Sequence, residues 1–451
     1  MSPPVAVDVL VLGGGMAGLT AAARSVQDGA SVLLVEKGAR CGGSAVHAEF
    51  IWTAPTLEVL REVNPLGDPE LAAHLIARRP ASLEWVADLG VTMGPEVELL
   101  GFGTGHRTDL AQLLTTLERI VRDAPRSEVL VAREPERLRI DDEGRVIGAE
   151  IAGGEGPRLA VTARSTILAT GGFAGSPELR RELIHPQATS LPLRANPHSD
   201  GAGLALGQSA GAAIGADRAG FYGHLMPAGV APDPQVGLAA LSFFHSEHGV
   251  LVNRAGRRFV DETIGDHLNT MATLEQPDAR ALLVCDERVH REWMLKPYVE
   301  GLEPIDKFAL AYRHGARCAV AESLDEFAEL PPEWGYPGDG VKETLRRFNE
   351  ECRDRTPDPP RRRDATPLTD PPYYVIEVAP AITFTFTGLL VDAAARVLRD
   401  DGTPIEGLLA AGADAGGLYV RAYAGGLAAA LVSGLSAADT ATRSLTPTGR
   451  R

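Results

Sequence analysis

The chain has 451 residues, of which 44% are hydrophobic and 23% are charged, and its formal net charge at pH 7 is −16. This composition is ordinary for a folded globular protein of two or three domains. An acidic chain of this kind repels nucleic acid and anionic membranes, so we expect neither as a partner.

The sequence carries no signal for targeting or for metal binding. No apolar run approaches the ~18 residues that a membrane span needs. Residues 1–8 lack the basic and apolar regions of a secretory signal, so we expect a cytoplasmic protein. The four cysteines show no CxxC spacing, and no cysteine lies near His245 and His248, so neither a disulfide framework nor a metal site is expected. We expect Arg361–Arg363 to lie in a solvated loop rather than in an anion site.

The first elements in chain order are a strand, a glycine-rich turn, a helix and a second strand. Asp8–Leu12 is a short apolar run suited to a buried parallel strand, and Gly13–Gly18 carries the pattern GxGxxG. A helical stretch follows over Leu19–Gln27, and a second strand, Ser31–Val35, ends on Glu36. In this context the motif predicts a dinucleotide site rather than a structural turn.

Each part of this unit has a physical task. Gly13 permits the tight turn, Gly15 lets a pyrophosphate approach the backbone, and Gly18 lets the helix pack closely on the strand. The unpaired N–H groups of the helix N-terminus face the phosphates. Glu36 accepts hydrogen bonds from a ribose diol and would repel a 2′-phosphate, which favours FAD or NAD over NADP.

Further motifs along the chain point to flavin. They include a glycine-rich stretch after the second strand, a buried strand that ends in Ala-Thr-Gly-Gly, a segment with Val-Asp-Glu, and glycine-rich segments near the end of the chain. In chain order they occupy residues 36–44, 165–173, 196–203, 249–262, 382–392, 404–412 and 423–426. In this order and spacing they resemble the fumarate reductase/succinate dehydrogenase flavoprotein family. Its 3-ketosteroid dehydrogenase and tricarballylate dehydrogenase branches are closest in pattern.

That resemblance implies an α/β fold, in which a glutathione-reductase-type, Rossmann-like FAD-binding domain is split by an inserted α+β capping domain. We place the first part of the FAD-binding domain at residues 1–220, the capping or substrate domain at 221–384, and the second part at 385–451. Two strand-like segments rich in Gly and Ala, 165–172 and 407–412, bracket a middle stretch that is richer in aromatic residues and Pro.

The resemblance also implies which residues bind FAD, without a covalent bond. Near the C-terminus, Gly425-Gly426 precede a strong helix former that extends towards Thr442. A helix that starts there aims its N–H groups at the flavin C2 carbonyl and favours negative charge at N1 of the reduced cofactor. The expected cofactor-binding residues are Gly13, Gly15, Met16, Ala17, Gly18, Glu36, Lys37, Gly42, Gly43, Ser44, His47, Pro135, Ala169, Thr170, Gly171, Asp200, Gly412, Asp414, Gly425, Gly426, Ala428 and Ala429.

Several positions depart from the fumarate reductase pattern. The family's histidine before the paired glycines corresponds here to Phe384, its proton-donating arginine to Gly265, and its carboxylate-clamping arginine to Tyr423. Fumarate reduction is therefore not expected. The acid that usually follows Ala-Ala-Gly is replaced by Ala413, with Asp414 one place later, so a contact of Asp414 with the ribityl chain is left open.

Tyr423 instead matches the tyrosine that precedes the glycine-rich turn in ketosteroid dehydrogenases. The resemblance implies that its phenol, together with a backbone N–H of the helix start, binds a substrate carbonyl and stabilises the enolate that forms as an α-proton leaves. Hydride then passes from the β-carbon to flavin N5 and leaves an α,β-unsaturated carbonyl product. The alternative is that Tyr423 only packs on the flavin.

The remaining candidates are secondary. His224 falls where the family places a substrate-binding histidine, so it is either catalytic or a structural hinge residue. Asp266 with His267 forms either a base or a structural pair. His47 resembles the flavin-facing histidine of the tricarballylate branch. The expected substrate-binding residues are Tyr419, Arg421, Phe384 and Asp266, although Tyr419 can be a pocket wall and Arg421 an exposed residue.

Three functions remain open. The first is an FAD-dependent dehydrogenase or oxidase that desaturates a carbonyl-activated CH–CH bond in a small molecule with a carbonyl or carboxyl group. The second is the reverse enzyme, an ene-reductase fed by an external electron donor, for which the chain carries no haem CxxCH motif. The third is a non-catalytic flavin-binding protein, which the complete set of cofactor motifs beside Tyr423 disfavours.

Overall fold

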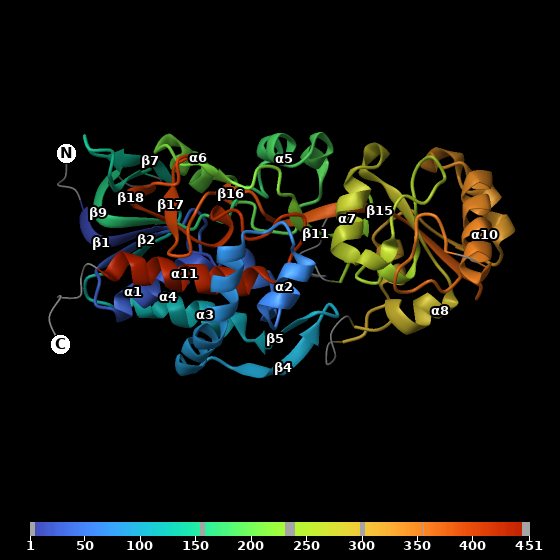
Figure 1. Cartoon of the computed structure of the whole chain (residues 1–451), viewed down its shortest axis with the longest axis horizontal. Coiled ribbons are helices and arrows are strands. Elements are labelled where there is room, and N and C mark those ends of the chain that lie inside the picture. Colours follow the sequence, from blue (N-terminus) through green and yellow to red (C-terminus); the bar gives the residue numbers. More distant parts are fainter. Residues whose placement is uncertain (1–4, 154–157, 231–239, 298–302, 355, 444–451) are drawn as a thin grey trace. The chain divides into compact units, whose positions relative to one another are not determined.

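A computed structural model of the chain describes residues 5–153, 158–230, 240–297, 303–354 and 356–443 (Figure 1). The chain divides into two compact units. Unit 1 comprises Met1–Ile184, Ala195–Phe221 and Phe384–Arg451, and unit 2 comprises His185–Arg194 and Tyr222–Thr383.

The core of unit 1 is an eight-stranded sheet with parallel central strands. The strand β1 (Val5–Leu12) lies between β2 (Val32–Val35) and β9 (Leu159–Leu168) and is parallel to both. At the two sides, β6 (Glu128–Leu130) pairs in parallel with β2, and β18 (Pro404–Ala410) pairs in parallel with β9. Val9–Leu12 and all of β2 are buried, as apolar strands of a parallel sheet are. The predicted α/β class with a parallel sheet is confirmed.

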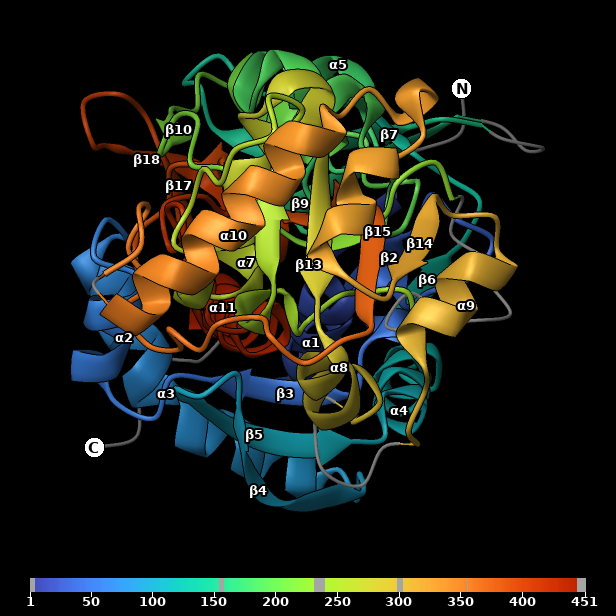
Figure 2. The ribbon, with the colours of Figure 1, turned by 90° about the vertical axis from the view of Figure 1, so that its right-hand side faces the viewer.

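The outer part of this sheet is antiparallel. The strand β8 (Val146–Ile151) pairs with β9, β7 (Pro135–Ile140) pairs with β8, and β17 (Arg396–Leu398) pairs with β18. Unit 1 also holds a separate three-stranded antiparallel sheet in the order β3 (Phe50–Thr53), β5 (Gly103–Thr108) and β4 (Met93–Leu99), which Figure 2 shows clearly. A short pair links β10 (Ile214–Gly215) to β16 (Gly388–Leu389).

Two long helices of unit 1 pack against its first helix, and a third packs against one of these two. The helix α1 (Met16–Gln27) contacts α4 (Leu110–Arg122) and α11 (Gly426–Thr442), and α11 also contacts α3 (Pro69–Asp88) (Figure 1). A Cβ atom on Gly434 would lie 2.6 Å from the carbonyl oxygen of Ala17, so the close approach of α11 to α1 requires a glycine there. The shorter helices are α2 (Leu57–Val63), α5 (Pro177–Leu183) and α6 (Ala202–Ser209).

Unit 2 is built on a five-stranded sheet. Its order is β11 (Phe221–Pro227), β15 (Tyr373–Thr385), β13 (Ala281–Cys285) and β12 (Val250–Val252), and β14 (Cys318–Ala321) pairs with β15. The helix α10 (Gly338–Asp354) shares a buried apolar cluster with these strands through Val341, Leu345 and Phe348. The other helices of this unit are α7 (Asp266–Leu274), α8 (Glu287–Val289) and α9 (Lys307–Arg313).

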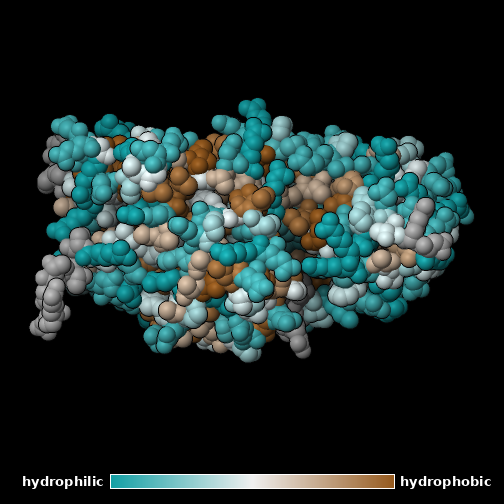
Figure 3. Space-filling model, in the orientation of Figure 1, coloured by the Kyte–Doolittle hydropathy of each residue, from teal (hydrophilic) through white to brown (hydrophobic). Residues whose placement is uncertain are grey.

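The face of the molecule drawn in Figure 3 is mostly hydrophilic, with scattered hydrophobic side chains. In the part of the chain that the structure describes, no helix has both the length and the apolar character that a membrane crossing requires.

Candidate functional site

At the turn between β1 and α1, Gly13 and Gly18 leave no room for a side chain, whereas Gly15 does. Gly13 has a φ of +110°, and a Cβ atom there would overlap the carbonyl oxygen of Ala169. A Cβ atom on Gly18 would overlap the carbonyl oxygen of Gly13. At Gly15, by contrast, the nearest atom would be Cα of Gly43 at 3.9 Å. The turn is therefore closed against the sheet and open at Gly15, where a phosphate can approach the backbone.

Glu36 is held against this turn. Its Oε2 accepts a hydrogen bond from the N–H of Gly14 (2.7 Å), and its Oε1 accepts one from the N–H of Gly38 (2.6 Å). The side chain is 6% exposed. Each carboxylate oxygen has a second lone pair, so both bonds leave Glu36 able to accept from a ribose hydroxyl. Nearby, burial raises the pKa of the Cys41 thiol to about 12, which keeps it a neutral packing group.

Two of the expected cofactor residues neutralise each other. Lys37 Nζ lies 2.7 Å from Oδ2 of Asp200 and 2.7 Å from Oε2 of Glu134. The hydrogen bonds to these carboxylates raise the pKa of Lys37. Pro135 follows Glu134 and begins β7. This pairing ties β7 and the segment before α6 to the end of β2.

Asp414 is occupied by the protein's own backbone. Its carboxylate accepts from the N–H of Thr170 (2.5 Å), the hydroxyl of Thr170 (3.1 Å) and the N–H of Gly172 (2.9 Å), and it is 1% exposed. Burial raises its pKa, against the lowering effect of these bonds. A Cβ atom on Gly203 would also overlap this carboxylate. Asp414 therefore fastens the Ala169–Gly172 turn.

Helix capping separates the expected cofactor-binding helices from the others in unit 1. The helices α2, α3, α4 and α5 are capped by side chains of Thr56, Asp68, Asp109 and Ser176. In contrast, the N-cap residues of α1, α6 and α11 are Gly15, Gly201 and Gly425, which have no side chain to cap the helix. At two of these starts another residue accepts instead: Thr170 Oγ1 accepts from the N–H of Gly203 in α6, and the Tyr423 hydroxyl accepts from the N–H of Gly426 in α11. The start of α1 behind Gly15 leaves backbone N–H groups for a ligand, so the residues present there fit a cofactor that carries phosphates.

The remaining cofactor candidates lie around these helix starts. Gly42 and Gly43 have positive φ and open the 3-10 helix Gly43–His47. In that helix, Ser44 Oγ accepts from the N–H of Asn196 (2.9 Å), and His47 is exposed. The N–H of Gly412 donates to Ser433 of α11 (2.9 Å). Ala428 and Ala429 are buried in the first turn of α11.

Tyr423 lies at the start of α11 in an aromatic cluster. Its hydroxyl oxygen accepts from the N–H of Gly426 (2.6 Å), so this N–H is directed at the phenol itself rather than at a ligand as expected. The Tyr423 ring lies 5.7 Å from Trp52, 6.1 Å from Phe384 and 6.3 Å from Phe386. Tyr423 and Phe384 are half-buried. These rings form an apolar, aromatic cluster in unit 1.

Tyr419 and Arg421, two of the expected substrate-binding residues, differ in exposure. Tyr419 is 2% exposed, and its hydroxyl donates to the carbonyl oxygens of Ala424 (2.8 Å) and Gly425 (3.0 Å). Arg421 has a φ of +54° and an exposed side chain, while its backbone N–H donates to Ala219. Tyr419 thus serves the backbone beside Tyr423, and Arg421 gives no support for a carboxylate clamp.

Unit 2 brings His224 and Asp266 together. Nδ1 of His224 contacts Oδ2 of Asp266 in a short hydrogen bond, and both side chains are buried. The His224 ring packs edge-on against Tyr222 (4.9 Å) and Phe244 (4.5 Å). Burial raises the pKa of Asp266 to about 8 and lowers that of His224 well below its usual value. Burial likewise lowers the pKa of His267 to about 3.

Two buried cations in unit 2 were not predicted from the sequence. Arg194 is 7% exposed, and its Nη1 donates to Thr383 Oγ1 (2.6 Å). Lys307 is also 7% exposed, and its ammonium lies 5.2 Å from the centre of the Phe244 ring. The charges of both act on Asp266 and lower its pKa against the effect of burial. Neither residue belongs to a motif, so only the fold reveals them.

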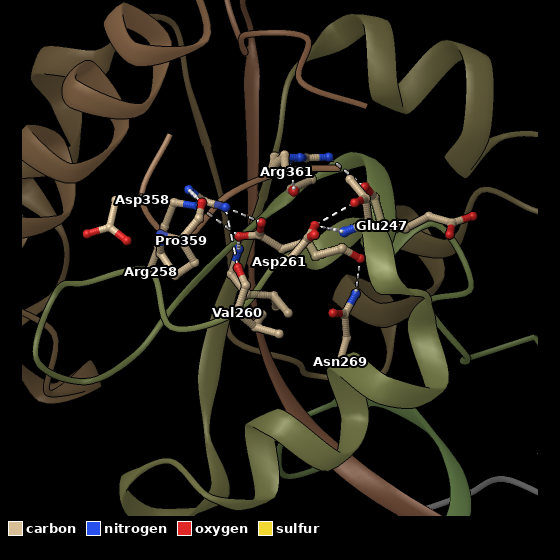
Figure 4. A network of polar contacts seen from close by, with 12 residues as sticks. Glu247, Arg258, Val260, Asp261, Asn269, Asp358, Pro359 and Arg361 are labelled. Atoms are coloured by element: carbon tan, nitrogen blue, oxygen red, sulfur yellow. Dashed lines mark hydrogen bonds and ion pairs between the residues drawn. The ribbon is translucent and has the colours of Figure 1, made fainter. Parts of the chain in front are cut away.

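The expectation for Arg361 was wrong. Arg361 is 5% exposed, and its guanidinium donates to the carbonyl oxygens of Gly249 (2.9 Å) and Glu247 (2.6 Å) (Figure 4). It lies 5.5 Å from the ring of Phe348, next to the buried ion pair between Arg258 and Glu262. The sequence of a short arginine run does not show whether one of its side chains is buried and bonded to backbone carbonyl oxygens. Arg361 is a structural residue of unit 2.

Gly265 occupies the position at which the resemblance places the proton-donating arginine. Gly265 has a φ of +109°, and a Cβ atom there would meet no atom within 4 Å. Because φ is positive at this position, any side chain would strain the backbone, and glycine is the residue that fits.

Among the described residues, no group of three or more His, Cys, Asp or Glu side chains is arranged to hold a metal ion.

The chain is similar in sequence to known FAD-binding proteins. The model of the family described as FAD binding domain matches residues 8–427. A fumarate reductase (cytochrome) from Shewanella frigidimarina is 27% identical and aligns over 94% of this chain and 75% of its own length. The 4-oxocyclohexanecarboxylate 2-dehydrogenase of Sinomonas cyclohexanicum is 26% identical over 94% of this chain and 90% of its own length.

Two solved structures share the fold. The 3-ketosteroid-Δ4-(5α)-dehydrogenase from Rhodococcus jostii RHA1, in complex with 4-androstene-3,17-dione, aligns with a TM-score of 0.76 and 21% identity over 97% of each chain. The open conformation of a flavocytochrome c3 fumarate reductase aligns with a TM-score of 0.72 and 22% identity, over 98% of this chain and 79% of that chain. The predicted fold, an FAD-binding domain with a capping domain, is confirmed.

Proposed function

The chain belongs to the FAD binding domain family, in its fumarate reductase/succinate dehydrogenase branch, and on that premise we propose that it desaturates a C–C bond next to a carbonyl group. It is an FAD-dependent oxidoreductase that acts on CH–CH groups. The direction of the reaction, the substrate and the residues that carry the chemistry are the proposal. A cytoplasmic location is part of it.

The observation that carries the proposal is the placement of Tyr423. Its oxygen accepts from the N–H of Gly426, and a phenol that accepts a hydrogen bond is a stronger donor through its own proton. A substrate carbonyl that receives this proton in a hydrogen bond gains stabilisation as it becomes an enolate oxygen. The surrounding rings of Trp52, Phe384 and Phe386 favour an apolar, cyclic carbon skeleton.

The overall reaction removes a proton from the α-carbon and a hydride from the β-carbon, which leaves a C=C bond conjugated to the carbonyl. When bound, FAD accepts the hydride. The α-proton is taken up by a general base. His224 is a buried residue of unit 2, where its Nδ1 is hydrogen-bonded to Asp266 and burial favours its neutral form.

Anaerobic mixing tests the function and its alternatives. The saturated ketone 4-oxocyclohexanecarboxylate and the enone 4-androstene-3,17-dione, taken from the names of a relative and of a structural neighbour, serve as probes for the two directions of the reaction. Bleaching of the flavin absorbance by a saturated ketone supports desaturation. Reoxidation of pre-reduced protein by an enone, without bleaching by any ketone, supports the ene-reductase instead. A flavin that responds to neither class of compound contradicts a catalytic role on carbonyl compounds.

A further inference from the structure

A buried amide holds the chain segment that carries Tyr419 and Tyr423. Asn64 directly follows α2 and is 3% exposed. Its Nδ2 donates to the carbonyl oxygen of Leu418 (2.7 Å), and its Oδ1 accepts from the N–H of Val420 (3.1 Å). One planar side chain therefore bonds to the backbone on both sides of Tyr419, much as a neighbouring strand would.

The connection between α2 and α3 is shaped to this contact. A Cβ atom on Gly67 would overlap both Nδ2 of Asn64 and the carbonyl oxygen of Leu418, so only glycine leaves room for the bond. The N–H of Asp68 also donates to the carbonyl oxygen of Gly417 (2.9 Å). The connection is thus bonded to the backbone of three residues before Tyr423, namely Gly417, Leu418 and Val420.

Tyr419 connects the segment held by Asn64 to the turn beside Tyr423. Its hydroxyl bonds to the carbonyl oxygens of Ala424 and Gly425, and its ring lies 5.5 Å from the Tyr423 ring. Gly425 has a φ of +93°, and a Cβ atom there would overlap the carbonyl oxygen of Trp52. The next N–H, that of Gly426, binds the Tyr423 hydroxyl.

We infer that Asn64 and Tyr419 are positioning residues, which act through the backbone of residues 417–426 to hold the Tyr423 hydroxyl in place. The inference rests on the function proposed for Tyr423. A satisfied, buried polar network is rigid, and an oxyanion donor is effective only when it is aimed before the reaction begins. Neither residue needs to touch the substrate for this role, because the Asn64 amide and the Tyr419 hydroxyl each form hydrogen bonds with backbone groups.

Kinetics of matched variants test this role. With a ketone that the enzyme oxidises, Asn64→Ala and Tyr419→Phe are expected to lower kcat by about 10–100-fold, the effect of a small misplacement of a catalytic group, with little change in KM. Asn349→Ala is the control for the first variant. Asn349 is 6% exposed and also donates to and accepts from one backbone residue, Leu368, within unit 2. Tyr336→Phe, which removes a buried hydroxyl from Glu377 in unit 2, is the control for the second.

A double-mutant cycle separates positioning from general loss of structure. In the Tyr423→Phe background, Asn64→Ala and Tyr419→Phe are expected to change kcat by less than about 2-fold, because the group that they position is gone. If the two substitutions lower kcat as much in that background as in the wild type, or if the controls lower it equally, the inference is wrong. If Asn64→Ala fails to fold, Tyr419→Phe, which removes one oxygen atom, decides the question.

A spectroscopic readout makes the inference independent of any substrate. In the holoprotein labelled with 3-fluorotyrosine, the ¹⁹F signal of Tyr423 is assigned by its loss in Tyr423→Phe. We expect Asn64→Ala and Tyr419→Phe to shift, split or broaden that signal, and the two controls to leave it in place. An unchanged Tyr423 signal in both variants would overturn the inference. A displaced signal together with an active Tyr423→Phe enzyme would instead support the positioning role and refute the proposed function of Tyr423.

Discussion

The hydroxyl oxygen of Tyr423 accepts a hydrogen bond from the backbone N–H of Gly426, 2.6 Å away, at the first residue of α11. This single bond joins a side chain that can polarise a carbonyl to the first backbone N–H of the helix. The helix dipole adds positive potential at the same place. We therefore propose the start of α11 as a place in unit 1 that can stabilise developing negative charge.

Glu36→Ala is expected to weaken FAD binding by ~1.5–3 kcal/mol, the usual worth of a hydrogen bond to a charged group. The wild-type protein is expected to be yellow and to release FAD on acid denaturation. Affinity is measured by fluorescence titration of the apoprotein. Glu136→Ala, which removes only an ion pair with the exposed Arg158, is the control and is expected to bind FAD like the wild type. A colourless protein that binds NAD but not FAD would refute the cofactor assignment.

Fumarate is not expected to be reduced at rates typical of enzymes, ~1–1,000 per second, in an assay with reduced viologen. The positions at which the resemblance places a histidine and two arginines hold Phe384, Gly265 and Tyr423 instead. Rapid fumarate reduction would contradict this prediction. Arg194 and Lys307 of unit 2 would then be the cations to replace first, because they are the buried basic side chains whose charges reach Asp266.

The fold was more predictable from the sequence than the site. The glycine turn, the strands β1 and β2 and the strand β9 were recognisable because local sequence dictates them: apolar runs form buried strands, and a Gly-rich turn joins strand to helix. The placement of Asp414 was not recognisable, because its partners Thr170 and Gly172 are more than two hundred residues away in the chain.

The residues that sequence reasoning missed share one property: their partners are distant backbone groups or side chains. Asn64 bonds to Leu418 and Val420, Arg361 to carbonyl groups of another segment, and Arg194 to Thr383. No motif or periodicity records such pairs. Asn64 at the end of a short helix reads as an ordinary helix terminus until the fold brings residues 417–420 beside it.

Stability is expected to depend on pH through Asp266. Burial raises the pKa of this carboxyl from 3.8 to about 8, so between these values the folded protein holds a proton that the unfolded chain releases. Its stabilising contribution is complete below the unfolded pKa and is lost as the pH rises through the folded pKa. Relative to Asp266→Asn, the wild-type free energy of unfolding should therefore fall by up to ~1.4 kcal/mol per pH unit in this window.

Urea unfolding of the two proteins at about pH 5 and about pH 7.5 measures this difference. At the higher pH, the free energy of unfolding of Asp266→Asn is expected to rise relative to that of the wild type. A difference that stays constant, or that changes in the opposite direction, would show that Asp266 is ionised in the folded protein.

The central claim, that Tyr423 is the electrophilic group, is tested most directly by the turnover of fully flavinated Tyr423→Phe with a ketone that the wild type oxidises. The substitution keeps the ring and its contacts with Trp52 and Phe386, so FAD content and Tm should change little. Loss of one oxyanion donor is expected to lower kcat ~100–1,000-fold, or about 2.7–4 kcal/mol. Retention of more than about a third of wild-type turnover with chemistry rate-limiting, far above that expected loss, would contradict the claim and reduce Tyr423 to a wall of the pocket.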